Sequence, residues 1–323
     1  MHCGQKMQRW GRSAAGKTRW FCRFCAKSHI QKRADTSKRW RKRLLRLWLT
    51  GNKTLEDIAA HNSCTVRTLL NRFSGFWTDF PLPVIPSTLS HTYLVVDAIY
   101  LAGHSECVLI GRTGNNHVFW LFARQETLVA WVYFFRKLPI PAALICDAQS
   151  GLLSAVKEVW PTIPVQRCLA HLQRLAVSKL TKHPQTPAGQ ELLKLVYAIH
   201  GVKTAQDRAK WLADFETWKV RWEKFLKERT HGIHPSGKNS WWYTHRRIRA
   251  LKYTLEQSIL SLFTSVDHPD VPRTSNLVEG GINSRLKELL RRHRGMSLEH
   301  KKALVAHYLD SRSVPQKPTR NFH

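Results

Sequence analysis

The sequence is 323 residues long and 43% of it is hydrophobic, which excludes a disordered basic tail and leaves room for two or three domains. Lys and Arg number 52 against 22 Asp and Glu, a formal net charge of +30 that is spread along the whole chain. Such a charge predicts a polyanionic partner, with nucleic acid as the leading one. A protein that is only generally basic, like those associated with ribosomes, is the alternative.

Apolar runs fall short of the roughly 20 residues that span a bilayer, and the polar, basic N-terminus lacks the apolar core of a signal peptide. Seven cysteines, an odd number with one Cys-x-x-Cys pair, suit a reducing cytosol better than a disulfide framework. We therefore expect a cytoplasmic, nucleoid-associated protein that makes no contact with membranes.

Residues 1–35 predict a zinc-ribbon-like segment. Cys22 and Cys25 form one knuckle, and Cys3 resembles the second half of another. Thiolates two residues apart can share a tetrahedral Zn²⁺, which then replaces the core that so short a segment cannot build. Four ligands are needed, and the candidates for the fourth are His2, His29 and a residue upstream of Met1. The alternative is a degenerate ribbon without metal.

Residues 36–79 predict a helix-turn-helix DNA-binding domain. Apolar residues of helical period mark a first and a last helix, and Thr54 is suited to cap a short helix between them. The apolar positions are Trp40, Leu44, Leu47 and Trp48 in the first helix and Val66, Leu69, Leu70 and Phe73 in the last. The polar face expected to reach bases or phosphates carries Thr65, Arg67, Thr68, Asn71 and Arg72. An ordinary helical pair is the alternative.

Prolines in residues 80–91 predict an extended linker, and beyond it strands and helices alternate. The expected strands are 93–101, 106–112, 117–123, 143–147 and 163–168, and the expected helices between the later ones lie near 127–137 and 150–159. This order predicts an α/β fold with a mixed sheet covered by helices.

Residues 173–272 predict a helical insertion rich in Lys, Arg and Trp, with a break at 232–240. A final strong helix is expected at 274–290. Its apolar stripe is Val278, Ile282, Leu286, Leu289 and Leu290, and its polar stripe is Asn276, Glu279, Asn283 and Lys287.

Three carboxylates stand out in a chain that otherwise avoids acids: Asp97 inside an apolar strand, Asp147 at a strand end, and Glu279 on the final helix. A buried acid is costly unless something offsets its charge. Carboxylate oxygens suit Mg²⁺, and two such ions can activate phosphodiesters. Glu288, on a similar face of the helix but two and a half turns away, competes with Glu279.

Three segments carry a family resemblance: VVDAIYL, CDAQSGLLSAVKEVWPTIPVQRCLAHLQR and TSNLVEGGINSRLKELLRRHRGMS. With them the chain resembles a DDE transposase of the mutator-like superfamily, in its bacterial insertion-sequence branch. The resemblance implies a ribonuclease-H-like core at 92–172 and 273–323, interrupted by the insertion. It implies a catalytic triad of Asp97, Asp147 and Glu279 rather than Glu288.

The second segment includes a Cys-x-x-His signature, Cys168 and His171. We expect His171 to point toward the catalytic site, where it contacts a phosphate near the scissile bond or holds a neighbouring side chain. A packed helix pair is the alternative. Half of a zinc site is a weaker interpretation, because no second pair of ligands lies nearby in the sequence.

Further DNA contacts are expected where aromatic and basic residues alternate after 240, and at the end of the final helix. The candidates are Trp241, Trp242, Arg246, Arg247, Arg291 and Arg292. At least one of the two tryptophans is expected to be buried. Gly280 and Gly281 leave room beside Glu279 for DNA or another helix.

The sequence thus predicts a DNA transposase that binds the terminal inverted repeats of an insertion sequence and then target DNA. Its cofactors would be two Mg²⁺ or Mn²⁺ ions, and one structural Zn²⁺ if the ribbon is complete. Because two element ends must be paired, a homodimer or larger assembly on double-stranded DNA is expected. The alternatives are a non-catalytic DNA-binding regulator derived from such an enzyme, and a metal-dependent nuclease that cuts without joining.

Overall fold

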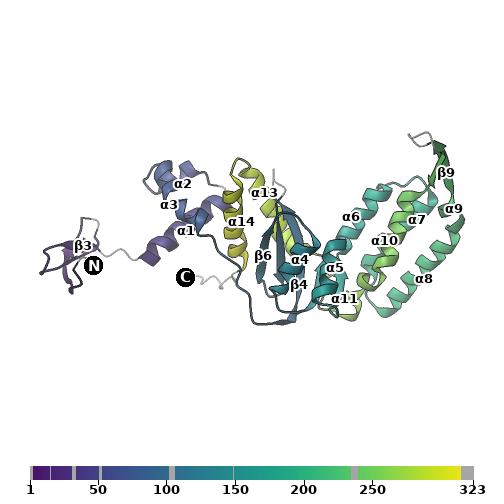
Figure 1. The fold of residues 1–323 in the computed structure, drawn as a ribbon, viewed down its shortest axis with the longest axis horizontal. Coiled ribbons are helices and arrows are strands. Elements are labelled where there is room, and N and C mark those ends of the chain that lie inside the picture. Colours follow the sequence, from purple (N-terminus) through teal and green to yellow (C-terminus); the bar gives the residue numbers. More distant parts are fainter. Residues whose placement is uncertain are drawn as a thin grey trace, which may run out of the picture. The chain divides into compact units, whose positions relative to one another are not determined.

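The computed structural model describes residues 3–14, 16–30, 34–50, 53–101, 106–147, 149–233 and 239–313. They form two compact units, residues 1–79 and 80–323, and each is considered by itself (Figure 1). None of the described helices is long and apolar enough to cross a membrane.

The first unit opens with a small antiparallel sheet in the order β1-β2-β3. Its strands are β1 (Gln8–Arg12), β2 (Thr18–Phe21) and β3 (Ser28–Ile30). Among the described residues from 3 to 30, Cys22 is the one buried hydrophobic residue. A segment with so little apolar core is compatible with the predicted zinc-ribbon-like segment, because a metal can replace a core in small segments.

Three helices follow: α1 (Ala34–Thr50), α2 (Leu55–His61) and α3 (Val66–Thr78). Thr54 caps α2 in a capping box with Asp57. The predicted apolar stripes are only partly right, because Leu47 and Leu70 are exposed. The buried positions are Leu44, Leu45 and Leu49 on α1 and Leu69, Phe73 and Phe76 on α3.

The second unit is built on a five-stranded mixed sheet in the order β6-β5-β4-β7-β8. The strands are β4 (Leu89–Tyr100), β5 (Cys107–Thr113), β6 (Val118–Ala123), β7 (Pro141–Cys146) and β8 (Val165–Arg167). β4, β5 and β6 are antiparallel, and β7 and β8 run parallel to β4. All five predicted strands are present. The predicted linker is too long, because the buried Leu89 already pairs with Pro141.

The two faces of the sheet are covered by different helices. Leu94 and Val96 of β4 pack into a core with α4 (Leu128–Arg136) and α5 (Ser150–Val159), both predicted. Side chains alternate along a strand, so Val95, Asp97 and Ile99 face the other side. There α12 (Asn276–Val278) approaches β4 and β5, and α14 (Leu298–Ser313) lies against β6.

Between β8 and the C-terminal helices lies an insertion with its own core, which includes Trp211, Phe215 and Trp218. Its helices are α6 (Leu169–Leu180), α7 (Pro187–Ala198), η1 (Ile199–Gly201), α8 (Ala205–Arg221), α9 (Glu223–Lys227), α10 (Arg246–Leu262) and α11 (Thr264–Asp267). The prediction of an all-helical insertion is wrong. β9 (Arg229–Ile233) and β10 (Asn239–Tyr243) form an antiparallel pair around the predicted break.

The predicted final helix is irregular and is not the last. It consists of α12 (Asn276–Val278), the π-helical segment η2 (Glu279–Asn283) and α13 (Ser284–Arg292). All five residues of its predicted apolar stripe are buried. A further helix, α14 (Leu298–Ser313), follows and was not predicted.

Candidate active site

The sheet register brings Asp97 and Asp147 to one level. Val95 of β4 pairs with Ile145 of the parallel strand β7, and each aspartate lies two residues further along its chain. Asp147 directly follows the end of β7, and its Oδ1 accepts a hydrogen bond from the backbone N–H of Gln149 (3.0 Å). Two carboxylates are therefore placed at one level on neighbouring strands, Asp97 within β4 and Asp147 directly after β7.

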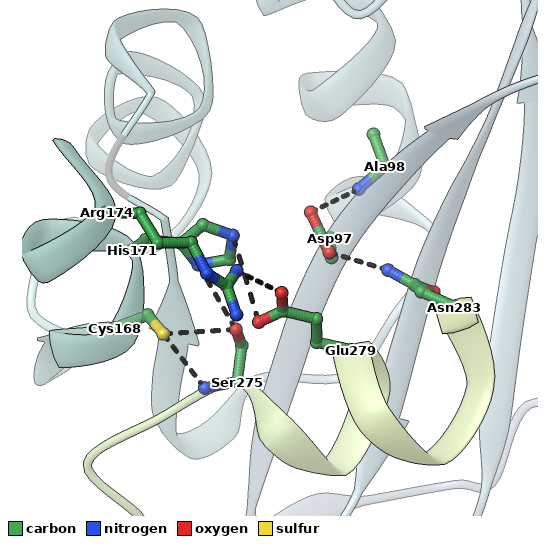
Figure 2. Close-up of polar contacts among 8 residues, drawn as sticks. All are labelled: Asp97, Ala98, Cys168, His171, Arg174, Ser275, Glu279 and Asn283. Carbon is green, nitrogen blue, oxygen red and sulfur yellow. Dashed lines mark hydrogen bonds and ion pairs between the residues drawn. The ribbon is translucent and has the colours of Figure 1, made fainter. Parts of the chain in front are cut away.

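Asp97 is held by two hydrogen bonds. Its Oδ1 accepts from the backbone N–H of Ala98 (2.9 Å), and its Oδ2 accepts from Nδ2 of the buried Asn283 (2.6 Å) (Figure 2). Burial raises the pKa of Asp97 above its ordinary value, and the negative charges of Asp147 and Glu279 add to the rise. The site therefore carries more negative charge than its own hydrogen bonds compensate.

Glu279 reaches the same place from η2. Figure 2 shows it on the turn before Asn283, with the Asn283 side chain directed toward Asp97 and the Glu279 carboxylate directed toward Arg174 and His171. Its Oε1 accepts a hydrogen bond from Nη1 of Arg174 on α6, and its Oε2 lies 4.0 Å from Nε2 of His171. The structure thus brings together Asp97, Asp147, Glu279 and His171, the four residues that the sequence predicted to be catalytic.

The π-helical turn has visible causes. Arg112 of β5 donates through Nη1 to the carbonyl of Leu277 (2.9 Å), and a Cβ on Gly281 would lie 2.7 Å from the same nitrogen. A Cβ on Gly280 would lie 2.4 Å from Oδ1 of Asn276. The two glycines therefore make room for side chains of this chain, which corrects the expectation that they leave space for DNA or another helix. A π-turn at a functional site is a common use of this rare geometry.

Cys168 and His171 connect α6 to the segment that carries Glu279. The buried Cys168 Sγ accepts hydrogen bonds from the backbone N–H and the Oγ of Ser275 (both 3.2 Å), and that Oγ lies 3.4 Å from Nδ1 of His171. Burial acts to raise the pKa of Cys168, but the hydrogen bonds from His171 and Ser275 outweigh it and lower the pKa to about 7. The hydrogen bond to Cys168 raises the pKa of His171, which favours the protonated imidazole beside Glu279.

Sequence reasoning missed a fourth acid, Glu126, between β6 and α4. Burial raises its pKa, and the charges of Asp147 and Asp97 contribute, so it lies within electrostatic reach of the site. Its Oε1 accepts a hydrogen bond from Nε1 of the buried Trp131 (3.3 Å). The available signal was topological, because β4 and β6 run in the same direction and Glu126 follows the carboxyl end of β6.

The donor set suits hard divalent cations, which prefer carboxylate oxygens. The raised pKa of Asp97 reflects a negative charge that such an ion would compensate. Within the described residues, however, the carboxylates do not yet form a group of three with ligand atoms all within 4.8 Å of one another. Arg174 occupies Oε1 of Glu279, so this oxygen must exchange partners before it can bind a metal.

In the first unit, the cysteines form such a group. The Sγ atoms of Cys3, Cys22 and Cys25 all lie within 4.8 Å of one another, and Cys3 and Cys22 are separated by 3.5 Å. The backbone N–H of Cys25 is the main group that lowers the pKa of Cys22 to about 7, which favours the thiolate that zinc requires. His29 lines the same pocket, and His2 lies outside the described residues.

On α3, the predicted DNA-binding residues divide into two kinds. Arg67, Thr68 and Asn71 are exposed. Arg72 is half-buried, donates to Sγ of Cys64 (3.4 Å) and lies over the ring of Trp40 at 5.1 Å. Arg72 therefore contributes to the packing of the three helices, whereas the other three remain available to a ligand.

In the insertion, the predicted burial of a tryptophan is wrong, because Trp241 and Trp242 are 46% and 41% exposed. The Arg229 guanidinium lies 4.0 Å from the ring centre of Trp241, a cation–π contact that orders the ring. Arg246 and Arg247 are exposed in the first turn of α10, directly after the hairpin. The hairpin and this turn thus combine aromatic and cationic groups at the surface.

At the end of α13, Arg291 and Arg292 are exposed. Arg292 donates to Oε1 of Glu288 (2.9 Å), and Arg285 lies 3.8 Å from the other oxygen of the same carboxylate. Glu288 is thus bound into surface ion pairs on its own helix. Glu279, by contrast, lies close enough to Asp97 for its charge to raise the pKa of that aspartate.

Comparisons with known proteins agree with the resemblance seen in the sequence. Residues 90–232 match the family model described as transposase, mutator family. No curated protein matches the chain. A chain from the cryo-EM structure of the simian T-cell lymphotropic virus intasome in complex with PP2A regulatory subunit B56 gamma is similar at 12% identity and a TM-score of 0.21. The match covers 45% of this chain and 64% of that one, less than two thirds of its length, and supports no conclusion about the fold.

Proposed function

We propose, from the premise that residues 90–232 belong to the mutator family of transposases, that this protein is the DNA transposase of a bacterial insertion sequence. It would bind the terminal inverted repeats, cleave phosphodiesters there and transfer the freed strands to target DNA. The observation that carries this proposal is the convergence of Asp97, Asp147 and Glu279 in a chain with a net charge of +30. The mixed sheet with an acid on its central strand β4 supports a ribonuclease-H-like core.

Asp97, Asp147 and Glu279 would hold two Mg²⁺ or Mn²⁺ ions. When bound, two such ions supply an activated attacking oxygen and stabilise the leaving oxygen of the phosphodiester. Asn283 orients Asp97 through its 2.6 Å hydrogen bond, and Cys168 with Ser275 fixes the start of α6 relative to the segment carrying Glu279. His171, with its raised pKa, would donate a proton or a hydrogen bond to a phosphate oxygen beside Glu279.

DNA recognition would lie mainly in the first unit. Arg67, Thr68 and Asn71 of α3 are exposed and would read the element ends as the recognition face of a helix-turn-helix. The cluster of Cys3, Cys22 and Cys25 would hold one structural Zn²⁺, with His29 as the fourth ligand within reach of the same pocket. The exposed groups of the hairpin, α10 and α13 would contact the DNA backbone and unpaired bases.

The decisive experiment incubates the purified full chain and Mg²⁺ with DNA that carries the candidate element ends, and maps cleaved and joined strands. Cleavage at the ends followed by joining to target DNA is the expected result. Cleavage without joining would point to a nuclease, and binding without cleavage would point to a regulator. Pairing of two ends requires at least a dimer, so the molecular mass of the protein–DNA complex should correspond to two or more chains.

A further inference from the structure

The least expected contact in the candidate site is that between Arg174 and Glu279. Arg174 projects from α6, and its Nη1 donates to Oε1 of Glu279 (Figure 2). The Arg174 side chain is 60% exposed, whereas that of Glu279 is 24% exposed. A surface arginine therefore reaches inward to one of the three proposed metal ligands.

This contact is incompatible with a metal on the same carboxylate oxygen. A guanidinium and a divalent cation would compete for the oxygen's lone pairs, and their like charges would repel each other at close range. Arg174 must consequently leave Oε1 of Glu279 when a metal binds this oxygen. Among the described residues, Arg174 has no ion pair with a second acid to which it could transfer.

The incoming DNA provides a suitable partner. A guanidinium binds phosphate oxygens through two parallel N–H donors, and it remains charged at every relevant pH. Arg174 can reach a bound strand by side-chain rotation alone, because most of its side chain is already at the surface. The backbone of α6 stays in place, since Leu169 N–H donates to the carbonyl of Arg273 (3.0 Å) and Cys168 is bonded to Ser275.

We propose that Arg174 is a phosphate-binding residue of the cleavage site, which holds Glu279 until metal takes that carboxylate and then holds a phosphate of the bound strand. This inference rests on the proposed function and adds a residue to its substrate site. It differs from a merely structural ion pair, because an exposed pair of that kind contributes little to stability and affects neither ligand.

The proposal predicts effects of opposite sign on two ligands of the full chain. Without DNA, Arg174→Ala should bind Mn²⁺ about three- to ten-fold more tightly than the parent protein in calorimetric titration, because the competing cation is gone. Arg136→Ala, which breaks the exposed pair with Glu158 on the far side of the sheet, removes the same charge and should leave Mn²⁺ affinity unchanged. Equal melting temperatures of the three proteins would confirm that each is folded.

When DNA is the ligand, Arg174→Ala should weaken binding rather than strengthen it. The probe is a 30-base-pair fluorescein-labelled duplex of random sequence, with its affinity measured by anisotropy in EDTA and in Ca²⁺. The parent protein should gain several-fold in affinity on addition of Ca²⁺, and Arg174→Ala should lose this gain while its affinity in EDTA stays within about two-fold. Arg174→Lys keeps the charge but not the two parallel donors, so it should retain part of the gain in DNA affinity on addition of Ca²⁺.

Weaker Mn²⁺ binding by Arg174→Ala, or an unchanged Ca²⁺ gain, would overturn the assignment of Arg174. Asp97→Asn separates this failure from failure of the proposed function. If Asp97→Asn loses Mn²⁺ while Arg174→Ala behaves like the parent, only the role of Arg174 is wrong. If the parent binds no Mn²⁺, or Asp97→Asn binds it equally well, the carboxylate site and the role of Arg174 fail together.

Discussion

The two compact units differ in how they hold the groups that would bind ligands. In residues 1–79, three cysteine sulfurs are already gathered within 4.8 Å, and Arg67 and Asn71 project from α3 without a side-chain contact among the described residues. In residues 80–323, Asp97 and Glu279 are both occupied by side chains of their own chain. The first unit presents its ligand-binding groups already in place. In the second unit, the carboxylates must exchange contacts with their own chain for contacts with a metal.

This difference suits an enzyme that must not cut before its DNA is in place. Recognition groups that are preformed lose little conformational freedom on binding. A reaction centre whose carboxylates are engaged by side chains of its own chain would release them only when metal and phosphate bind. The following predictions test the contrast, from the largest expected effect to the smallest.

The carboxylates should be indispensable for chemistry and dispensable for binding. Asp97→Asn, Asp147→Asn and Glu279→Gln should each reduce cleavage and joining by roughly a thousand-fold or more, because each removes charge that holds metal. Binding of the element ends should persist. The measurement is strand mapping alongside a mobility-shift assay.

Glu288→Gln is the matched control, because it neutralises a carboxylate on the adjoining helix α13 that pairs with Arg285 and Arg292. It should retain near-parental activity. Full activity in any of the three carboxylate variants, or loss of activity in Glu288→Gln, would show that the site has been assigned to the wrong acids.

The cysteine cluster should retain its metal through purification, whereas the carboxylates should need added metal. Elemental analysis should find one zinc per chain, and Cys22→Ser should reduce it to nearly none and unfold the first three strands, since such segments take much of their folding energy from the metal. The melting transition of residues 80–323 should not move.

Cys64→Ser is the control for the zinc measurement, because Cys64 lies in the same unit but outside the cluster and accepts a hydrogen bond from Arg72. Its zinc content should equal that of the parent. A parent protein free of zinc would mean that the three sulfurs stay close without a metal, and the contrast between the two units would disappear.

On α3, substitutions of exposed residues should change DNA specificity, whereas substitution of the packed Arg72 should change stability. In a fragment of residues 1–79, Arg67→Ala or Asn71→Ala should reduce discrimination between element ends and random duplex by about 1–3 kcal/mol if these residues read bases. Arg72→Ala should mainly lower the melting temperature, because Arg72 packs on Trp40. Titrations at several salt concentrations measure both affinities, and equal binding of random DNA by the parent fragment would contradict the assignment.

The smallest effect concerns the stability of the carboxylate site. Because the pKa of Asp97 is raised, its ionisation destabilises the folded protein as pH rises above the ordinary value of 3.8. Asp97→Asn should therefore raise the melting temperature at pH 7 in EDTA, on the order of 2 °C, with a difference that vanishes below pH 3.8. Added Mn²⁺ should reverse the order, because only the parent gains from binding it. A variant less stable than the parent in EDTA would show that the Asn283 contact outweighs the burial of charge.

The elements that the sequence predicted well are those with a strong local pattern. Strands such as Cys107–Thr113 are apolar runs bounded by turns, and Asp97 and Asp147 are conspicuous because acids are rare there. The helix α14 was missed because its buried residues run without interruption from Ala303 to Leu309, so no stripe of helical period appears.

Other features depend on contacts that sequence spacing does not contain. The π-helical turn follows from Arg112, 165 positions away from its acceptor Leu277. The pairing of Arg174 with Glu279 likewise joins residues from two distant helices, although the i, i+3 spacing from His171 places Arg174 on the same face of α6. The sequence analysis did not predict that both Trp241 and Trp242 are exposed, because tryptophan side chains are highly buried on average.

The insertion leaves and rejoins the core at a single stem. Cys168 and Ser275 are hydrogen-bonded although they lie 107 positions apart, and the next link, from Leu169 to Arg273, closes the stem further. A segment whose two ends are neighbours behaves as a module, because a short turn could bridge them. The core could thus tolerate exchange, shortening or enlargement of the insertion beyond α6, which carries His171 and Arg174. New chain ends could also be opened there, while the link between the segments that carry the second and third carboxylates stays intact. Such proteins would then diversify by replacing the insertion, while the stem residues Cys168, Leu169, Arg273 and Ser275 stay unchanged.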